Sequence, residues 1–129
     1  MLQRLKYLRL SSNKLTGTIP TELGHLGLSE ELILNHNMLI GSLPKEVILS
    51  FTDVKAMGLA NNSLTGTIPT ELGLLTNANY LRLEENELRG SIPSELGAMT
   101  NIRSMILTEN KVSQIFVWVQ VVDIHPSGQ

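Results

Sequence analysis

Histidine and carboxylate side chains are the residues of this 129-residue chain whose types could do chemistry. The histidines are His25, His36 and His125, and none keeps a repeated spacing from a serine or an acid. A nucleophile triad needs these groups within hydrogen-bond reach of one another. Glu84 and Glu85 are neighbours, but adjacent residues on a strand point to opposite faces, which argues against a paired acid and base. The sequence therefore predicts no catalytic residues and no enzyme.

Metal and cofactor sites find no support in the composition. The chain has no cysteine, so neither a thiolate metal site nor a disulfide framework is possible. It contains no glycine-rich phosphate loop and no metal-ligand spacing. A net charge of −2 does not favour nucleic acid or a membrane surface, and no apolar run approaches the roughly 20 residues that span a bilayer. We expect no metal, no cofactor, no nucleic-acid partner and no membrane span in this chain.

The chain is built from a repeat of about 24 residues, and this repeat determines which side chains lie together on its surface. The string LxLxxNxLxGxIP occurs at residues 8–20 and 81–93, and drifted copies occur at 32–44, 57–69 and 105–116. The asparagines of these strings lie 24, 25, 24 and 24 residues apart. A fixed period of this length is the signature of a solenoid, in which stacked coils bury one continuous core. The asparagines are Asn13, Asn37, Asn62, Asn86 and Asn110.

The LxxLxLxxNxL pattern with its added GxIP resembles the plant-type leucine-rich repeat, over about residues 2–113. The spelling GTIPTELGLLT is also similar to repeats of diatom and other algal proteins. The resemblance implies an α/β repeat fold: a right-handed leucine-rich repeat solenoid of about five coils. A parallel β-sheet would line its concave side and short 3₁₀ or α turns its convex side. The resemblance also implies that the asparagines form a structural ladder, with each amide bonded to main-chain groups of the bends.

The other repeated positions have local physical reasons. Glycine four residues after each of the first four asparagines predicts a turn with positive φ, and proline three residues later should end an outer strand. Threonine or serine followed by glutamate then looks like the start of a helical turn, with the carboxylate near its positive end. The row of glutamates is thus predicted to be a solvated convex face. One extra residue between Val47 and Met57 predicts a bulge on the convex side.

The variable positions of the inner strands are the candidate binding residues, since side chains two, four and six residues before each asparagine should share the concave face. Tyrosine and arginine are enriched at binding hot spots. Ala56, Gly58 and Ala60 are small, which predicts a shallow dip in the middle of the sheet. The candidates are Tyr7, Arg9, Ser11, Glu31, Ile33, Asn35, Tyr80, Arg82, Glu84, Ser104, Ile106 and Thr108, with His36 beside the face.

These observations divide the chain into a leucine-rich repeat domain (1–113) and an atypical tail (114–129). The tail is rich in β-formers and is either a capping strand or an artefact of gene prediction. A large loss of thermal stability on its deletion would support the cap. Because the cysteine-paired caps usual in extracellular plant-type repeats are missing, we expect a fragment of a longer protein.

Two functions are compatible with this organisation. The first is a non-catalytic module that binds a protein or peptide ligand through the concave face, as the sensor part of a receptor-like protein. The alternative is a structural spacer, or a non-functional fragment of a larger leucine-rich repeat protein or receptor kinase. The compartment follows from the choice: extracellular or membrane-attached for a receptor-like protein, and soluble intracellular otherwise.

Overall fold

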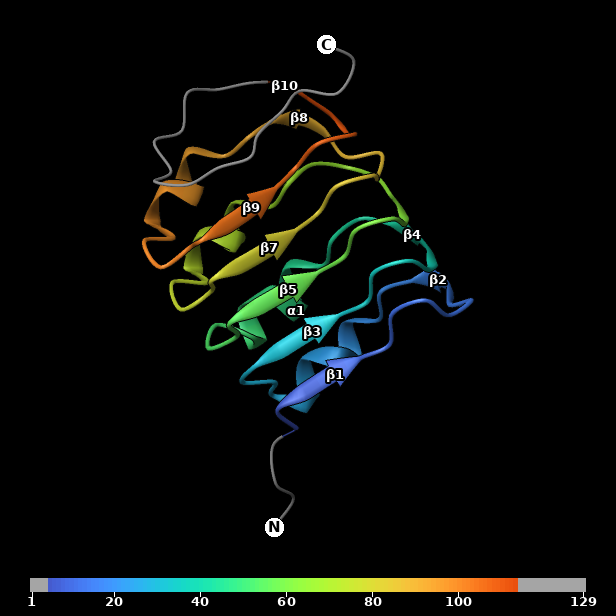
Figure 1. Ribbon diagram of the computed structural model, residues 1–129, viewed down its shortest axis with the longest axis horizontal. Coiled ribbons are helices and arrows are strands. Elements are labelled where there is room, and N and C mark those ends of the chain that lie inside the picture. Colours follow the sequence, from blue (N-terminus) through green and yellow to red (C-terminus); the bar gives the residue numbers. More distant parts are fainter. Residues whose placement is uncertain (1–4, 114–129) are drawn as a thin grey trace.

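A stack of parallel coils is the architecture of the computed structural model, which describes residues 5–113 (Figure 1). Successive coils each contribute one short strand to a five-stranded parallel sheet within this range, in the order β1-β3-β5-β7-β9. This order follows the chain, so each coil pairs with the next, as the repeat predicted. The strands are β1 (Tyr7–Arg9), β3 (Glu31–Ile33), β5 (Ala56–Gly58), β7 (Tyr80–Arg82) and β9 (Ser104–Ile106).

A second set of strands follows the bend of each coil. In the part of the chain that the structure describes, these strands form a three-stranded and a two-stranded parallel sheet. β2, β4, β6 and β8 each end before a repeated proline, which has no N–H to extend a ladder, whereas β10 ends at Ser113 in a coil whose equivalent position is Val117. The first sheet contains β2 (Thr16–Thr18), β4 (Met38–Gly41) and β6 (Ser63–Leu64), and the second contains β8 (Arg89–Ser91) and β10 (Lys111–Ser113).

Short helical turns close the coils, as predicted. Three are 3₁₀ helices, and the coil with the extra residue instead has an α-helix, so the insertion is taken up by a wider turn. The residue before each turn is the repeated proline, and no side chain caps the first turn. Threonine or serine therefore begins the three 3₁₀ turns without capping them, and Lys45 begins α1. The helices are η1 (Thr21–Leu26), α1 (Lys45–Ser50), η2 (Thr70–Leu74) and η3 (Ser94–Ala98).

The hydrophobic core lies between the five-stranded sheet on one side and the two smaller sheets and the helical turns on the other. Leu32 and Leu81, at equivalent strand positions, are 1% and 0% exposed, and burial of such a side chain contributes roughly 1.5–3 kcal/mol. The first coil differs, because Leu10 and Leu15 are each 38% exposed. These leucines pack against a following coil only, so their burial depends on the neighbour that stacks on them.

The repeated asparagines form the ladder that the resemblance implied. Asn86 Nδ2 donates to the carbonyl oxygens of Leu83 and Glu84 in its own coil and of Leu59 in the coil before. Its Oδ1 accepts a hydrogen bond of 3.0 Å from the Leu64 N–H. Asn13, in the first coil, bonds only its own coil. Each interior asparagine therefore joins two coils, and the same pattern recurs at Asn37, Asn62 and Asn110.

Two backbone positions in each of the first four repeats, and one in the fifth, take the left-handed conformation within the described residues. The repeated glycines have φ between 77° and 81°, as predicted, and a Cβ on Gly41 would lie 2.9 Å from a Thr18 methyl carbon of the preceding coil. The residue just before each ladder asparagine also has positive φ, which the sequence analysis missed. Two of these five, His36 and Asn61, are types that are enriched in this conformation. The others are Ser12, Glu85 and Glu109.

The ladder predicts a large difference between two asparagine substitutions. Asn86→Ala should destabilise the fold by about 2–4 kcal/mol, because buried backbone groups of two coils lose their partner. Asn13→Ala should cost about 1 kcal/mol or less, since Asn13 is exposed and bonds two carbonyl oxygens of one coil. Urea unfolding followed by circular dichroism measures both free energies. Equal losses would contradict the two-coil role of the interior ladder.

Candidate functional site

The candidate residues come together on the outer face of the β1-β3-β5-β7-β9 sheet, here called the concave face. The strand register aligns positions six and four before the asparagines in two rows, and backbone hydrogen bonds continue the pairing to a third row. The rows are Tyr7-Glu31-Ala56-Tyr80-Ser104, Arg9-Ile33-Gly58-Arg82-Ile106 and Ser11-Asn35-Ala60-Glu84-Thr108.

Arg9 is fixed at the first coil by two neighbours. Its Nε donates a hydrogen bond of 2.6 Å to Glu31 Oε2 in the next coil, and its guanidinium lies 4.8 Å from the centre of the Tyr7 ring. The hydrogen bond to Glu31, and then the charge of that carboxylate, raise the pKa of Arg9 above its ordinary value. Because the Arg9 side chain remains 60% exposed, this corner presents a permanent, oriented cation.

Arg82 and Glu84 form a second pair, within one coil. Arg82 Nε donates a hydrogen bond of 2.8 Å to Glu84 Oε1, and its terminal amino group donates to the same oxygen. The two partners differ in exposure, because the Arg82 side chain is 52% exposed and the Glu84 side chain only 8%. Glu84 was expected on an open surface, and the structure instead buries it. Within the described residues, no donor reaches Glu84 Oε2.

Glu84 and Glu85 do not lie on a strand, so the argument from strand alternation had the wrong premise. The inner strand β7 ends at Arg82, and Glu85 has φ 57° in the bend that follows. The two carboxylates still do not form an acid-base pair, since Glu84 is buried and Glu85 is exposed. The two carboxylates therefore differ in burial, and this difference, not the alternation of side chains along a strand, distinguishes their environments.

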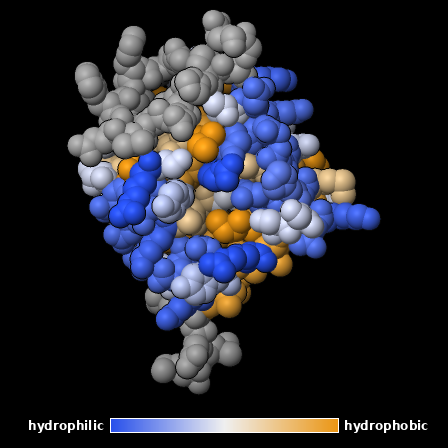
Figure 2. Space-filling model, in the orientation of Figure 1, coloured by the Kyte–Doolittle hydropathy of each residue, from blue (hydrophilic) through white to orange (hydrophobic). Residues whose placement is uncertain are grey.

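The dip predicted at coil three has a polar cover on one side. The Asn35 side chain lies over Gly58, and its Oδ1 accepts a hydrogen bond of 2.8 Å from the Ala60 N–H. Ile33 and Ile106 are partly buried in the same row as Gly58. Figure 2 shows apolar surface in the middle of this face and hydrophilic side chains around it. The middle of the concave face therefore combines apolar and polar groups, and the third coil (51–74) contributes no large side chain to it.

The edge of the face carries His36, which is exposed and sits in the bend with φ 58°. It lies next to the third row, as expected, because its N–H bonds the Ala60 carbonyl oxygen of the following coil. Among residues 5–113, no group of three histidine or acidic side chains is arranged to hold a metal ion. Nor does the described part of the chain contain a helix long and apolar enough to cross a bilayer.

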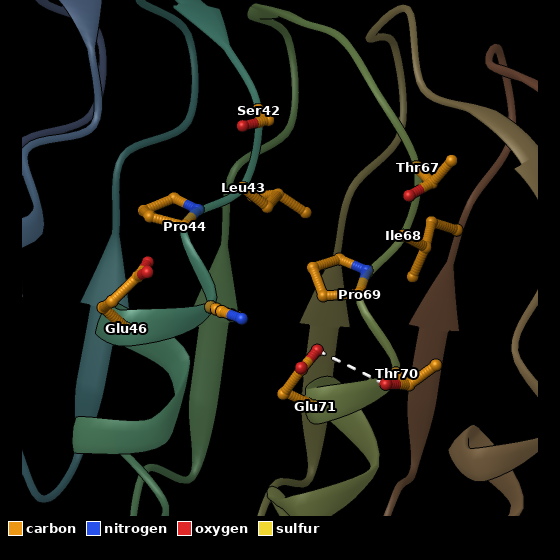
Figure 3. Close-up of a pocket in the computed structure, with 10 residues that line it drawn as sticks. Ser42, Leu43, Pro44, Glu46, Thr67, Ile68, Pro69, Thr70 and Glu71 are labelled. Carbon is orange, nitrogen blue, oxygen red and sulfur yellow. Dashed lines mark hydrogen bonds between the residues drawn. The ribbon is translucent and has the colours of Figure 1, made fainter.

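A hollow of about 480 Å³, which the sequence pattern did not predict, lies on another side, where β4 leads into α1 and β6 leads into η2 (Figure 3). Pro44 and Pro69 line it from two successive coils, and Thr70 Oγ1 donates to Glu71 Oε2 there over 3.4 Å. A similar hollow of about 460 Å³ occurs one coil further on, lined by Pro93 and its neighbours. Because the same repeat positions line both, the hollows are a product of coil stacking.

Comparisons with known proteins agree with this geometry. The sequence profile described as Leucine Rich Repeat matches residues 4–26. This chain is a leucine-rich repeat protein. The BIR2 ectodomain from Arabidopsis thaliana is 31% identical, with a TM-score of 0.83 over 85% of this chain and 57% of that one. The repeats are of the type found in plant receptor ectodomains.

Two further structures are similar to this leucine-rich repeat protein. A chain of the Arabidopsis thaliana BIR3–SERK2 complex is 34% identical, with a TM-score of 0.81 over 85% of this chain and 58% of its own. The plant peptide hormone receptor RGFR1, in complex with RGF2, is 37% identical, with a TM-score of 0.79 over 83% of this chain and 17% of its own. This chain thus spans a little more than half of the BIR2 chain and of the matched chain in the BIR3–SERK2 complex, and less than a fifth of the RGFR1 chain. The sequence matches no curated protein.

The contact between Asn35 and Gly58 predicts a coupled stability effect. A Cβ at Gly58 would lie 2.8 Å from Asn35 Oδ1, so Gly58→Ala should displace the amide and leave the Ala60 N–H without its partner. The expected loss is about 1–3 kcal/mol, measured by urea unfolding. Asn35→Ala removes the same bond, so the double variant should lose less than the sum of the two. If the losses of the two single variants add up in the double variant, Gly58 and Asn35 do not act through the same hydrogen bond.

Proposed function

We propose that this leucine-rich repeat chain is a non-catalytic module that binds a protein or peptide ligand through its concave face. The observation that carries the proposal is the exposure of large, hot-spot side chains on one side of a rigid sheet. Tyr7, Tyr80 and Arg82 are about half exposed there, while the repeated leucines of the later coils, such as Leu32 and Leu81, are buried in the core. The variable positions are thus free to recognise a partner.

The similar structures support binding as the role. The peptide hormone receptor RGFR1 forms a complex with RGF2, and BIR3 forms a complex with SERK2, so similar repeats occur in proteins that bind other proteins or peptides. We extend this to a role as the sensor part of a longer, receptor-like protein, which would place the chain outside the cell. The alternative is a spacer or a non-functional fragment, in which the concave face would bind nothing.

A second exposed surface competes with the concave face and provides a matched control. Met38 and Ile40, on β4, are 49% and 51% exposed. Their cross-strand neighbours on β2 are Thr16 and Thr18, so a small apolar area lies beside hydroxyl groups. At the position of Ile40, coils one and three have threonine, so Ile40→Thr is a conservative change away from the concave face.

The test is selection of a displayed random-peptide library on the folded chain. Binders should lose affinity at least about tenfold on an Arg9→Ala/Tyr80→Ala/Arg82→Ala variant, because hot-spot truncations cost about 2 kcal/mol or more. Met38→Ser/Ile40→Thr should leave affinity within about twofold. Biolayer interferometry measures both, and circular dichroism verifies folding.

The outcomes separate the surfaces. Binding that survives the triple variant but is lost with Met38→Ser/Ile40→Thr would show that the site lies on the β2-β4-β6 sheet instead. An absence of binders would favour the spacer. Removal of Arg82 leaves Glu84 without its ion pair, so Tyr80→Ala alone serves as the variant if the triple variant does not fold.

A further inference from the structure

Glu84 Oε2 is the one buried side-chain oxygen or nitrogen without a hydrogen-bond partner in residues 5–113. Its sister oxygen Oε1 takes both donors of Arg82, and the side chain is 8% exposed. A buried acceptor with no donor costs about 1–3 kcal/mol, and more when it carries a charge. Folded proteins seldom keep such a group, so its presence on the concave face points to a use.

The surroundings of Glu84 are acidic and uncrowded. Its row neighbours are Ala60 on one side and Thr108 on the other, neither of which is a cation. Glu85 and Glu109 occupy equivalent bends of neighbouring coils, and the Asn86 N–H bonds the Glu109 carbonyl oxygen over 3.2 Å. Adjacent parallel strands lie about 4.8 Å apart, so these two exposed carboxylates repel one another. Neither forms an ion pair within the described part of the chain.

We propose that this corner of the concave face binds a basic side chain of a peptide ligand, with Glu84 Oε2 as the acceptor. This rests on the proposed function and adds the chemistry of one ligand position. A lysine ammonium or arginine guanidinium supplies the donor that Oε2 lacks, and hydrogen bonds between charged partners are the strongest available. Glu85 and Glu109 attract the cation from the rim, and its arrival relieves their repulsion.

Arg82 regulates access to this acceptor. It is the exposed member of its pair, and it bonds Glu84 through Oε1 only. In this proposal a ligand cation bonds Oε2 once the side chains that bury this oxygen shift, and it does not compete for the oxygen that Arg82 holds. On the preceding coil, the row neighbour Ala60 has only a methyl side chain, so no long side chain starts from that position. One carboxylate can thus serve a structural cation and a ligand cation at once.

The experiment uses concave-face peptides selected on the folded chain, each of which is also synthesised with norleucine in place of its lysine. Norleucine keeps the apolar stem and removes the ammonium group. The selected peptides should be enriched in lysine or arginine, and norleucine should weaken the dissociation constant at least about tenfold. Glu84→Gln should cause a similar loss, and norleucine should then cause no further loss on that variant.

Glu87→Gln is the matched control, because it removes the same charge three residues away at an exposed position. It should change the dissociation constant less than about twofold. Glu84→Gln keeps an oxygen for Arg82, and if it fails to fold, the norleucine peptides on the unaltered chain still decide the proposal.

Two failures are distinguishable. Peptides that depend on Arg9, Tyr80 and Arg82 but show no basic enrichment, or that tolerate norleucine or Glu84→Gln, would overturn this inference and leave the proposed function intact. Peptides that ignore the concave-face variants, or a selection that yields none, would overturn the proposed function and this inference with it.

Discussion

The amide of each interior asparagine is the interaction on which the rest of this solenoid depends. It donates to carbonyl oxygens of two successive coils and accepts from an N–H of the earlier one, as Asn86 does with Leu59, Leu83 and Leu64. Such a buried amide cannot shift without leaving several backbone groups unpaired. The ladder therefore fixes the distance between coils and the parallel register. Residues just before the asparagines accept a left-handed backbone because this network holds them there.

The same constraint makes the concave face a precise display surface. Once the register is fixed, equivalent positions of successive strands stand in straight rows, about 4.8 Å apart. Charged side chains in those rows then find partners across or along coils. Arg9 reaches Glu31 in the next coil, whereas Arg82 reaches Glu84 in its own. The first pair is largely solvated, and the second buries one carboxylate. Two similar Tyr-x-Arg strands thus present chemically different corners.

Repeated and variable positions contribute different kinds of surface. The hollows beside Pro44, Pro69 and Pro93 recur from coil to coil, since repeated residues line them, and they carry little information about a particular ligand. The concave face carries side chains that change from coil to coil. A ligand that spans several coils can read these differences in order, which is how a regular scaffold achieves specificity.

The sequence by itself determined the period, the positive φ of the glycines and which variable residues share a row, because these follow from local and repeated patterns, and the resemblance to leucine-rich repeats added the parallel sheet. The first coil's exposed leucines, the α-helical turn of coil two, the cover of Asn35 over Gly58 and the burial of Glu84 were decided only by the tertiary structure. The cover over Gly58 and the burial of Glu84 depend on how non-repeating side chains meet, whereas the exposed leucines and the helical turn depend on how the coils stack and close. A repeat pattern specifies which residues share a row, but it does not specify which of them are buried or paired. The tail at 114–129 lies outside the described residues, so its predicted role stays a prediction.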